Sequence, residues 1–180
     1  MRTSWGGQFF TKLTEKCNVY GDIIVPETDL VELPPAWPIN LKRRQDIVNL
    51  EASLKQTGTE QGLILSLPVK HWFCNGLYAR EIFIPKGTIL TGKIHKTEHL
   101  VIITQGIVEV VTEFQDLYIE APHTMITVPG TKRALFVHED IIWTNIHATN
   151  ERDINKIEDN IIAKNYNEVN FNKELEIWRG

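Results

Sequence analysis

The side chains of this sequence best suited to chemistry lie between residues 87 and 106. His95 and His99 are four residues apart, Glu98 directly precedes His99, and Lys93 stands two residues before His95. Imidazole and carboxylate groups bind Fe, Mn, Ni and Zn, whereas lysine and arginine bind anions. The segment therefore predicts either a divalent metal site with His95, His99 and Glu98 as ligands, or a pocket for a small anion.

One known metal motif fits the letters but not their context. Residues 95–99, HKTEH, match the HxxEH pattern of inverted zinc peptidases, which needs a helix to bring residues four apart onto one face. Gly92 precedes the pattern and the run LVIITQG follows it, and β-branched residues of this kind favour strands. We therefore reject the peptidase interpretation.

Short runs of β-branched and aromatic residues dominate residues 63–148. Seven such runs with no helical pattern between them predict an all-β core, a sandwich or a barrel. We expect Trp143 inside this core and His138 and His147 on its surface or in turns. The runs are LYAREIFI (77–84), HLVIIT (99–104), IVEVVTE (107–113), LYIEA (117–121), TMITV (124–128), ALFVHED (134–140) and IIWTNIHA (141–148).

The residues before these strands, 1–62, predict an extended arm followed by an amphipathic helix. Three prolines in VELPPAWPIN favour an extended path. Asn40 is the expected N-cap of the helix and Gly58 its end. The face that should be buried carries Ile47, Leu50 and Leu54. Tryptophans in the arm suit contacts with a partner, so we expect a homo-oligomer or a larger assembly formed through this arm.

The residues after the strands, 149–180, predict a second helix and a polar tail. Asn150 is the expected N-cap, because acidic residues and a helical spacing of isoleucines follow it. The three predicted parts of the chain are therefore 1–62, 63–148 and 149–180.

Composition limits the partners of the chain. The 180 residues, of which 42% are hydrophobic, can build one sizeable core. A net charge of −4 gives no general attraction for nucleic acid or anionic membranes, and no apolar run reaches the roughly 18 residues of a membrane span. Only two cysteines are present, Cys17 and Cys74, without CxxC spacing, which indicates a reducing compartment such as the cytoplasm.

The glycine and histidine spacing resembles the first motif of the cupin superfamily, G(x)5HxH(x)3-4E(x)6G. Gly87, His95 and Gly106 match, while Lys93 replaces the first histidine and His99 replaces the glutamate. The second motif, G(x)5PxG(x)2H(x)3N, is matched more loosely by residues 122–137, PHTMITVPGTKRALFV, in which a cation replaces the histidine. That cation is Arg133.

The resemblance implies a cupin-type jelly-roll β-barrel over residues 63–148, with the motif positions around its interior. Two cations beside two imidazoles then suit a small anionic ligand. Arg80 shares a strand face with Ile82 and Ile84, which places it in the pocket in one interpretation. The expected ligand-binding residues are Lys93, His95, His99, Arg133 and Arg80. The sequence is also similar to uncharacterised cupin-like proteins of tailed phages.

Two classes of function stay open. The first is a binding or assembly protein, as a phage virion component or a phage-encoded accessory protein in the cytoplasm of the host cell. The alternative is a small-molecule enzyme. It would be a metal-dependent oxygenase or isomerase with His95, His99 and a carboxylate from Glu98 or Glu139, or a metal-free sugar-nucleotide epimerase or isomerase with His95 as its base.

Overall fold

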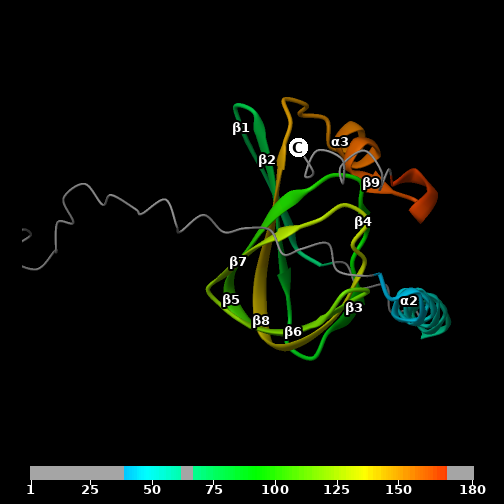
Figure 1. Ribbon diagram of the computed structural model, residues 1–180. Helices are drawn as coiled ribbons and strands as arrows, with labels where there is room; N and C mark the ends of the chain where they lie inside the picture. Colours follow the sequence, from blue (N-terminus) through cyan, green and yellow to red (C-terminus); the bar gives the residue numbers. More distant parts are fainter. Residues whose placement is uncertain (1–38, 62–66, 170–180) are drawn as a thin grey trace, which may run out of the picture. The chain divides into compact units, whose positions relative to one another are not determined.

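Two long antiparallel strands organise the fold of this computed structural model, which describes residues 39–61 and 67–169 (Figure 1). β5 (His99–Thr112) and β8 (Arg133–Ala148) pair along most of their length. Each covers two of the runs expected as separate strands. Buried and exposed side chains alternate along much of both, as expected for strands with one face covered. The predicted arm before residue 39 and the tail after residue 169 lie outside the described residues.

The other strands pair with this central pair or lie beside it (Figure 1). The main sheet has the order β1 (Val69–Cys74), β2 (Leu77–Ile84), β8, β5 and β6 (Asp116–Glu120). In addition, β3 (Ile89–Thr91) pairs with β8, and β7 (His123–Thr127) pairs with β5. β4 (Ile94–His95) and β9 (Ile162–Ala163) form a separate two-stranded sheet.

The all-β core with a helix on either side of it in the sequence is confirmed, but closure of the sheet into a barrel is not seen. Among the described residues, β1 pairs only with β2 and β6 only with β5. The core draws on four strands and includes Trp143, as expected. Its buried members are Ile84, Val101, Ile103, Val108, Val110, Ile119, Leu135, Val137, Ile141 and Trp143. Burying each large aliphatic side chain contributes about 1.5–3 kcal/mol.

Gly106 lets β5 follow β8 through a bulge. The register between the two strands shifts around this residue, and its φ is +90°. A Cβ atom here would lie 2.3 Å from the backbone oxygen of Asp140. Gly87, in the turn before β3, also has a positive φ, of +79°. Both glycines of the motif therefore occupy conformations that favour glycine.

The first helix, α2 (Leu41–Gln61), begins as predicted and ends later. The Oδ1 atom of Asn40 accepts a hydrogen bond from the backbone N–H of Arg43 at 3.1 Å, which confirms the N-cap. Ile47 is buried, with Leu50 half-buried beside it. The prediction that Gly58 ends the helix is wrong, because Gly58 keeps a helical backbone, which costs only about 1 kcal/mol relative to alanine.

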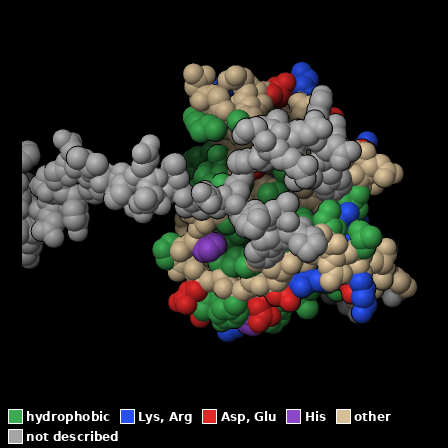
Figure 2. All heavy atoms as spheres, in the orientation of Figure 1, with side chains coloured by type: hydrophobic (Ala, Val, Ile, Leu, Met, Phe, Trp, Pro, Cys, Tyr) green, Lys and Arg blue, Asp and Glu red, His purple; other side chains and the backbone are tan. Residues whose placement is uncertain are grey.

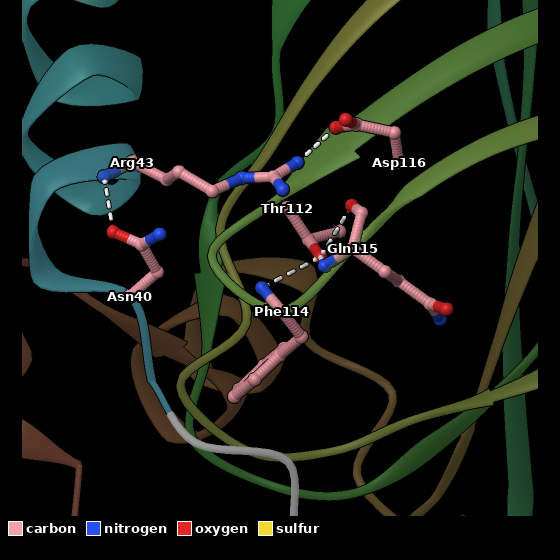
Figure 3. A network of polar contacts seen from close by, with 6 residues as sticks. All are labelled: Asn40, Arg43, Thr112, Phe114, Gln115 and Asp116. Carbon is pink, nitrogen blue, oxygen red and sulfur yellow. Dashed lines mark hydrogen bonds and ion pairs between the residues drawn. The ribbon is translucent and has the colours of Figure 1, made fainter.

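Ion pairs hold α2 against the turn between β5 and β6 (Figure 3). Arg43 reaches Asp116 of β6, and the hydroxyl of Thr112 accepts two backbone N–H groups within the turn. Arg44 lies 3.2 Å from the carboxylate of Glu113, which is completely buried. A buried carboxylate needs such partners, because an unpaired one would be strongly destabilising.

The second helix, α3 (Ile154–Ile161), is shorter than predicted. Its N-cap is Asp153, whose side chain accepts hydrogen bonds from two backbone N–H groups of the first turn. The prediction of Asn150 as the cap is wrong, because the Asn150 amide oxygen accepts the backbone N–H of Gly76 instead. Ile157 and Ile161 of α3 pack on Tyr78. Among the helices of the described residues, none combines the length and apolar character that crossing a membrane requires.

The bulge supports a first prediction. Gly106→Ala should lower the free energy of unfolding by about 3 kcal/mol or more, because a positive φ costs a non-glycine residue about 1–2 kcal/mol and the clash adds to this. Gly76→Ala is the matched control, since Gly76 has a φ of +79° but nothing within 4 Å of its added Cβ. Urea unfolding of both variants measures the difference. Equal losses would contradict a steric role for Gly106.

Candidate metal centre and adjoining cavity

Three strand ends bring three histidines together. His99 is the first residue of β5, and the register that pairs Leu100 with Ile146 of β8 makes His147 the next residue opposite it. His95 is carried by the short strand β4, where it pairs with Ile162 of β9. A separation of four in sequence thus becomes a contact because the chain bends between β4 and β5.

The three imidazoles form one compact, buried group. Their ring centroids are 4.1 Å apart for His95 and His99, 5.1 Å for His95 and His147, and 4.6 Å for His99 and His147. One ligating nitrogen from each ring lies within 4.8 Å of the other two. The side chains are only 9%, 4% and 2% exposed, in sequence order.

Within the described ranges, each ring has a buried nitrogen without a hydrogen-bond partner. These atoms are Nδ1 of His95, Nε2 of His99 and Nδ1 of His147. Nδ1 of His99 lies 3.3 Å from the backbone oxygen of Thr97, and the side chain of Asn145 also acts on this ring. A backbone carbonyl that accepts the other ring N–H commonly orients a metal-binding histidine in this way. Leaving a buried polar atom unpaired costs about 1–3 kcal/mol, and a shared metal ion would satisfy all three nitrogens.

Burial keeps the three imidazoles neutral at pH 7. It lowers the pKa of His95 to about 2, with the neighbouring charges of His99 and His147 adding to the effect. Burial also lowers the pKa of His99 to about 3 and that of His147 to about 4. A metal ion binds the neutral form of histidine, so no proton has to be displaced from these rings at neutral pH.

Arg133, expected in the pocket, is buried beside this group. Its guanidinium donates a hydrogen bond to the Oγ1 atom of Thr127 and lies 5.6 Å from the ring centroid of Trp143. Burial lowers the pKa of Arg133 to about 10, and the charge of Glu113 opposes that shift. Arg133 therefore remains positively charged at pH 7.

The other predicted residues differ in their positions. Arg80 lines the same cavity as His95. Lys93 lies at its rim with a side chain 56% exposed, and its Nζ is 3.0 Å from a carboxylate oxygen of Glu158 on α3. Glu98 and Glu139 are exposed and lie outside the histidine group.

The expectation that His147 lies on the surface or in a turn is wrong. Strand alternation carries the signal that would have found it, because Trp143, Asn145 and His147 are two apart and share one face of β8. With Trp143 already assigned to the core, His147 must point the same way. His138 faces elsewhere, half-buried, with its Nε2 3.3 Å from a carboxylate oxygen of Glu109.

A cavity of about 290 Å³ adjoins the centre. Two of the three histidines, His95 and His147, line it. Paired residues of β2 and β8 form another part of the cavity wall. Arg80 pairs with Asn145, and two residues further along β2 Ile82 pairs with Trp143. The cavity lining therefore combines charged and polar side chains with apolar ones.

Comparisons with known proteins give the fold a context. No protein-family model matches the chain, and neither does any curated protein. Solved structures that match include a cupin-2 domain protein from Shewanella frigidimarina (TM-score 0.39, 10% identity, 52% of this chain and 92% of that one). Another is a cupin-2 domain protein from Halorhodospira halophila (TM-score 0.42, 13% identity, 48% and 68%).

A third match is an RmlC-like cupin family protein with a double-stranded β-helix fold from Methanocaldococcus jannaschii (TM-score 0.39, 14% identity, 46% of this chain and 80% of that one). At this level of similarity the three structures assign no activity and no ligand to the chain.

The low histidine pKa values predict acid destabilisation of the metal-free protein. An unfolded histidine has a pKa near 6.5, so between pH 6.5 and about 4 the unfolded state binds more protons than the folded state. The free energy of unfolding then falls as the pH falls, by up to about 1.4 kcal/mol per pH unit for each histidine. Urea unfolding of chelator-treated protein at pH 7, 6 and 5 measures this slope.

Two variants serve as a matched pair for this slope. His147→Gln should reduce it, whereas His123→Gln should leave it unchanged, because His123 is exposed on β7. A wild-type stability that does not vary from pH 7 to pH 5 would contradict neutral burial of the three rings.

Proposed function

We propose that this chain is a cupin-like binding protein that holds one divalent transition-metal ion on His95, His99 and His147 and presents it to a small anionic ligand. The observation that carries the proposal is the buried group of three neutral imidazoles, which bring one nitrogen each within 4.8 Å of the other two. Each ring also has a buried nitrogen with no hydrogen-bond partner among the described residues. A structural group of packed histidines would be expected to use those nitrogens in hydrogen bonds.

The residues fit the needs of such an ion. Imidazole nitrogens suit Zn, Fe, Ni and Cu, and three protein ligands leave a coordination position open for another molecule. The candidate ligand atoms, one from each ring, lie within 4.8 Å of one another, which is close enough for one ion to be shared between them. When bound, the ion would act as a Lewis acid toward an oxygen atom of the ligand.

Arg133 explains why the ligand should be an anion. A fixed positive charge near the ion opposes metal binding by Coulomb repulsion. An anion that contacts both the ion and the guanidinium offsets that repulsion through charge-assisted hydrogen bonds. The cavity beside His95 and His147 gives such a ligand its place.

The geometry favours this proposal over a metal-free isomerase with His95 as its base. An imidazole with a pKa of about 2 accepts protons poorly near neutral pH. A histidine base also needs a carboxylate to orient it, and the two glutamates nearest in sequence do not serve: Glu98 is exposed, and Glu109 pairs with His138. The assembly role expected for the arm depends on residues outside the described ranges and stays a prediction, as does the similarity to phage proteins.

Metal analysis of the protein purified without chelators tests the proposal. We expect about one metal ion per chain in the wild type and less than a tenth of that in His147→Ala. His138→Ala and Glu98→Gln should keep the metal, because these residues lie outside the group. Thermal unfolding of each variant establishes that it is folded. Full metal content in folded His147→Ala, or its loss in Glu98→Gln, would show that a different ligand set holds the ion.

A further inference from the structure

The guanidinium groups of the cavity have more hydrogen-bond donors than partners. Arg133 has five N–H donors, and its hydrogen bond within the described residues goes to Thr127. Glu113, the acid whose charge acts on it, already pairs with Arg44 and accepts the backbone N–H of Lys132. Arg80 lines the same cavity, and its side chain makes no hydrogen bond or ion pair with another described residue.

These donors line the cavity and match a carboxylate. The planar fork of a guanidinium binds both oxygens of a carboxylate at once, and it does so most strongly where water is excluded. Lys93 is engaged by Glu158 at the rim. Two guanidinium groups of the cavity lining therefore have N–H donors without a partner among the described residues, which suits one carboxylate better than a diphosphate with its larger charge.

Part of the cavity wall is apolar. Ile82, Leu90 and Trp143 line it, and the first two pack against the main core. A ligand placed here gains free energy only from apolar surface. Its size follows from the volume, since a cavity of about 150 Å³ accepts benzene and this one measures about 290 Å³.

We propose that the ligand is a small monocarboxylic acid with an apolar body, of about ten non-hydrogen atoms. Its carboxylate lies between Arg133, Arg80 and the metal ion on the histidines, and its hydrocarbon part packs on Ile82, Leu90 and Trp143. The inference rests on the proposed function for the metal-facing contact alone, because the two arginines and the apolar wall belong to the cavity with or without the ion.

Calorimetric titration with three probes tests this ligand class. Benzoate carries both the carboxylate and an apolar body, acetate lacks the body, and benzamide lacks the charge. We expect benzoate to bind at least tenfold more tightly than either of the others. Acetate or inorganic phosphate binding as tightly as benzoate would overturn the apolar part, and benzamide binding as tightly would overturn carboxylate recognition.

Substitutions of Arg80 and Ile82 test the carboxylate contact and the apolar contact separately. Arg80→Gln should weaken benzoate binding at least tenfold, while Lys86→Gln, which removes an exposed cation outside the cavity lining, should leave it unchanged. Ile82→Thr should weaken benzoate and leave acetate as it was. Equal benzoate affinity in the wild type and in folded Arg80→Gln would overturn the proposed carboxylate site. Arg133→Met, if the variant folds, should weaken benzoate binding in the same way.

Titrating both zinc-loaded and chelator-treated protein separates this inference from the proposed function. Selective benzoate binding in a protein that binds no metal would refute the metal centre and sustain the ligand class. A bound metal on the three histidines with no preference for benzoate would sustain the centre and refute the ligand class.

Discussion

The pairing of β5 with β8 is the constraint on which the rest of the structure depends. These strands supply most of the buried core, from Val101 to Trp143, and the same register sets His99 beside His147 at their shared end. Because side chains alternate across a strand, a slip of one residue would send both histidines and the core residues to the outer face. The bulge at Gly106 accommodates the shift in register between the two strands. The β5–β8 register therefore determines both the core and the site.

The electrostatics of the interior follow from what is buried there. Burial lowers the pKa of all three histidines, so their imidazoles stay neutral at pH 7. A neutral imidazole can be buried at modest cost. The guanidinium of Arg133 stays charged and needs compensation that the described residues supply only in part, through Thr127 and the more distant charge of Glu113. A cation would give the three unpaired ring nitrogens a partner, and an anion would compensate the positive charge of Arg133. A metal ion with an anionic ligand meets both requirements at once.

Much of the fold could be predicted from the sequence, because local patterns control it. Residues 77–84 form β2 as expected, and Gly87 and Gly106 adopt the backbone that their motif requires. Helix ends were harder, since Gly58 is tolerated inside α2 and Asp153 competes successfully with Asn150 as a cap. The sequence predicts separate strands where the structure has the continuous strands β5 and β8, because the pairing between these two strands keeps each of them extended.

The candidate site could be predicted only in part, because it is assembled from distant segments. The spacing of His95 and His99 identified two of its members and the second motif placed Arg133 nearby. The third histidine lies 48 positions after His99 in the sequence, and only strand parity from Trp143 points to it. Glu98 looked like a ligand by proximity, yet it lies outside the strands in the bend between β4 and β5, where its side chain is exposed.

X-ray absorption spectroscopy of protein loaded with one equivalent of Zn²⁺ tests the central claim most directly. The account predicts a first shell of nitrogen and oxygen at about 2.0–2.1 Å, with the outer-shell scattering of three imidazole rings. The same measurement on His147→Ala should show the loss of one ring. A first shell of oxygen alone, or the scattering of a single imidazole in the wild type, would contradict a metal centre built from His95, His99 and His147.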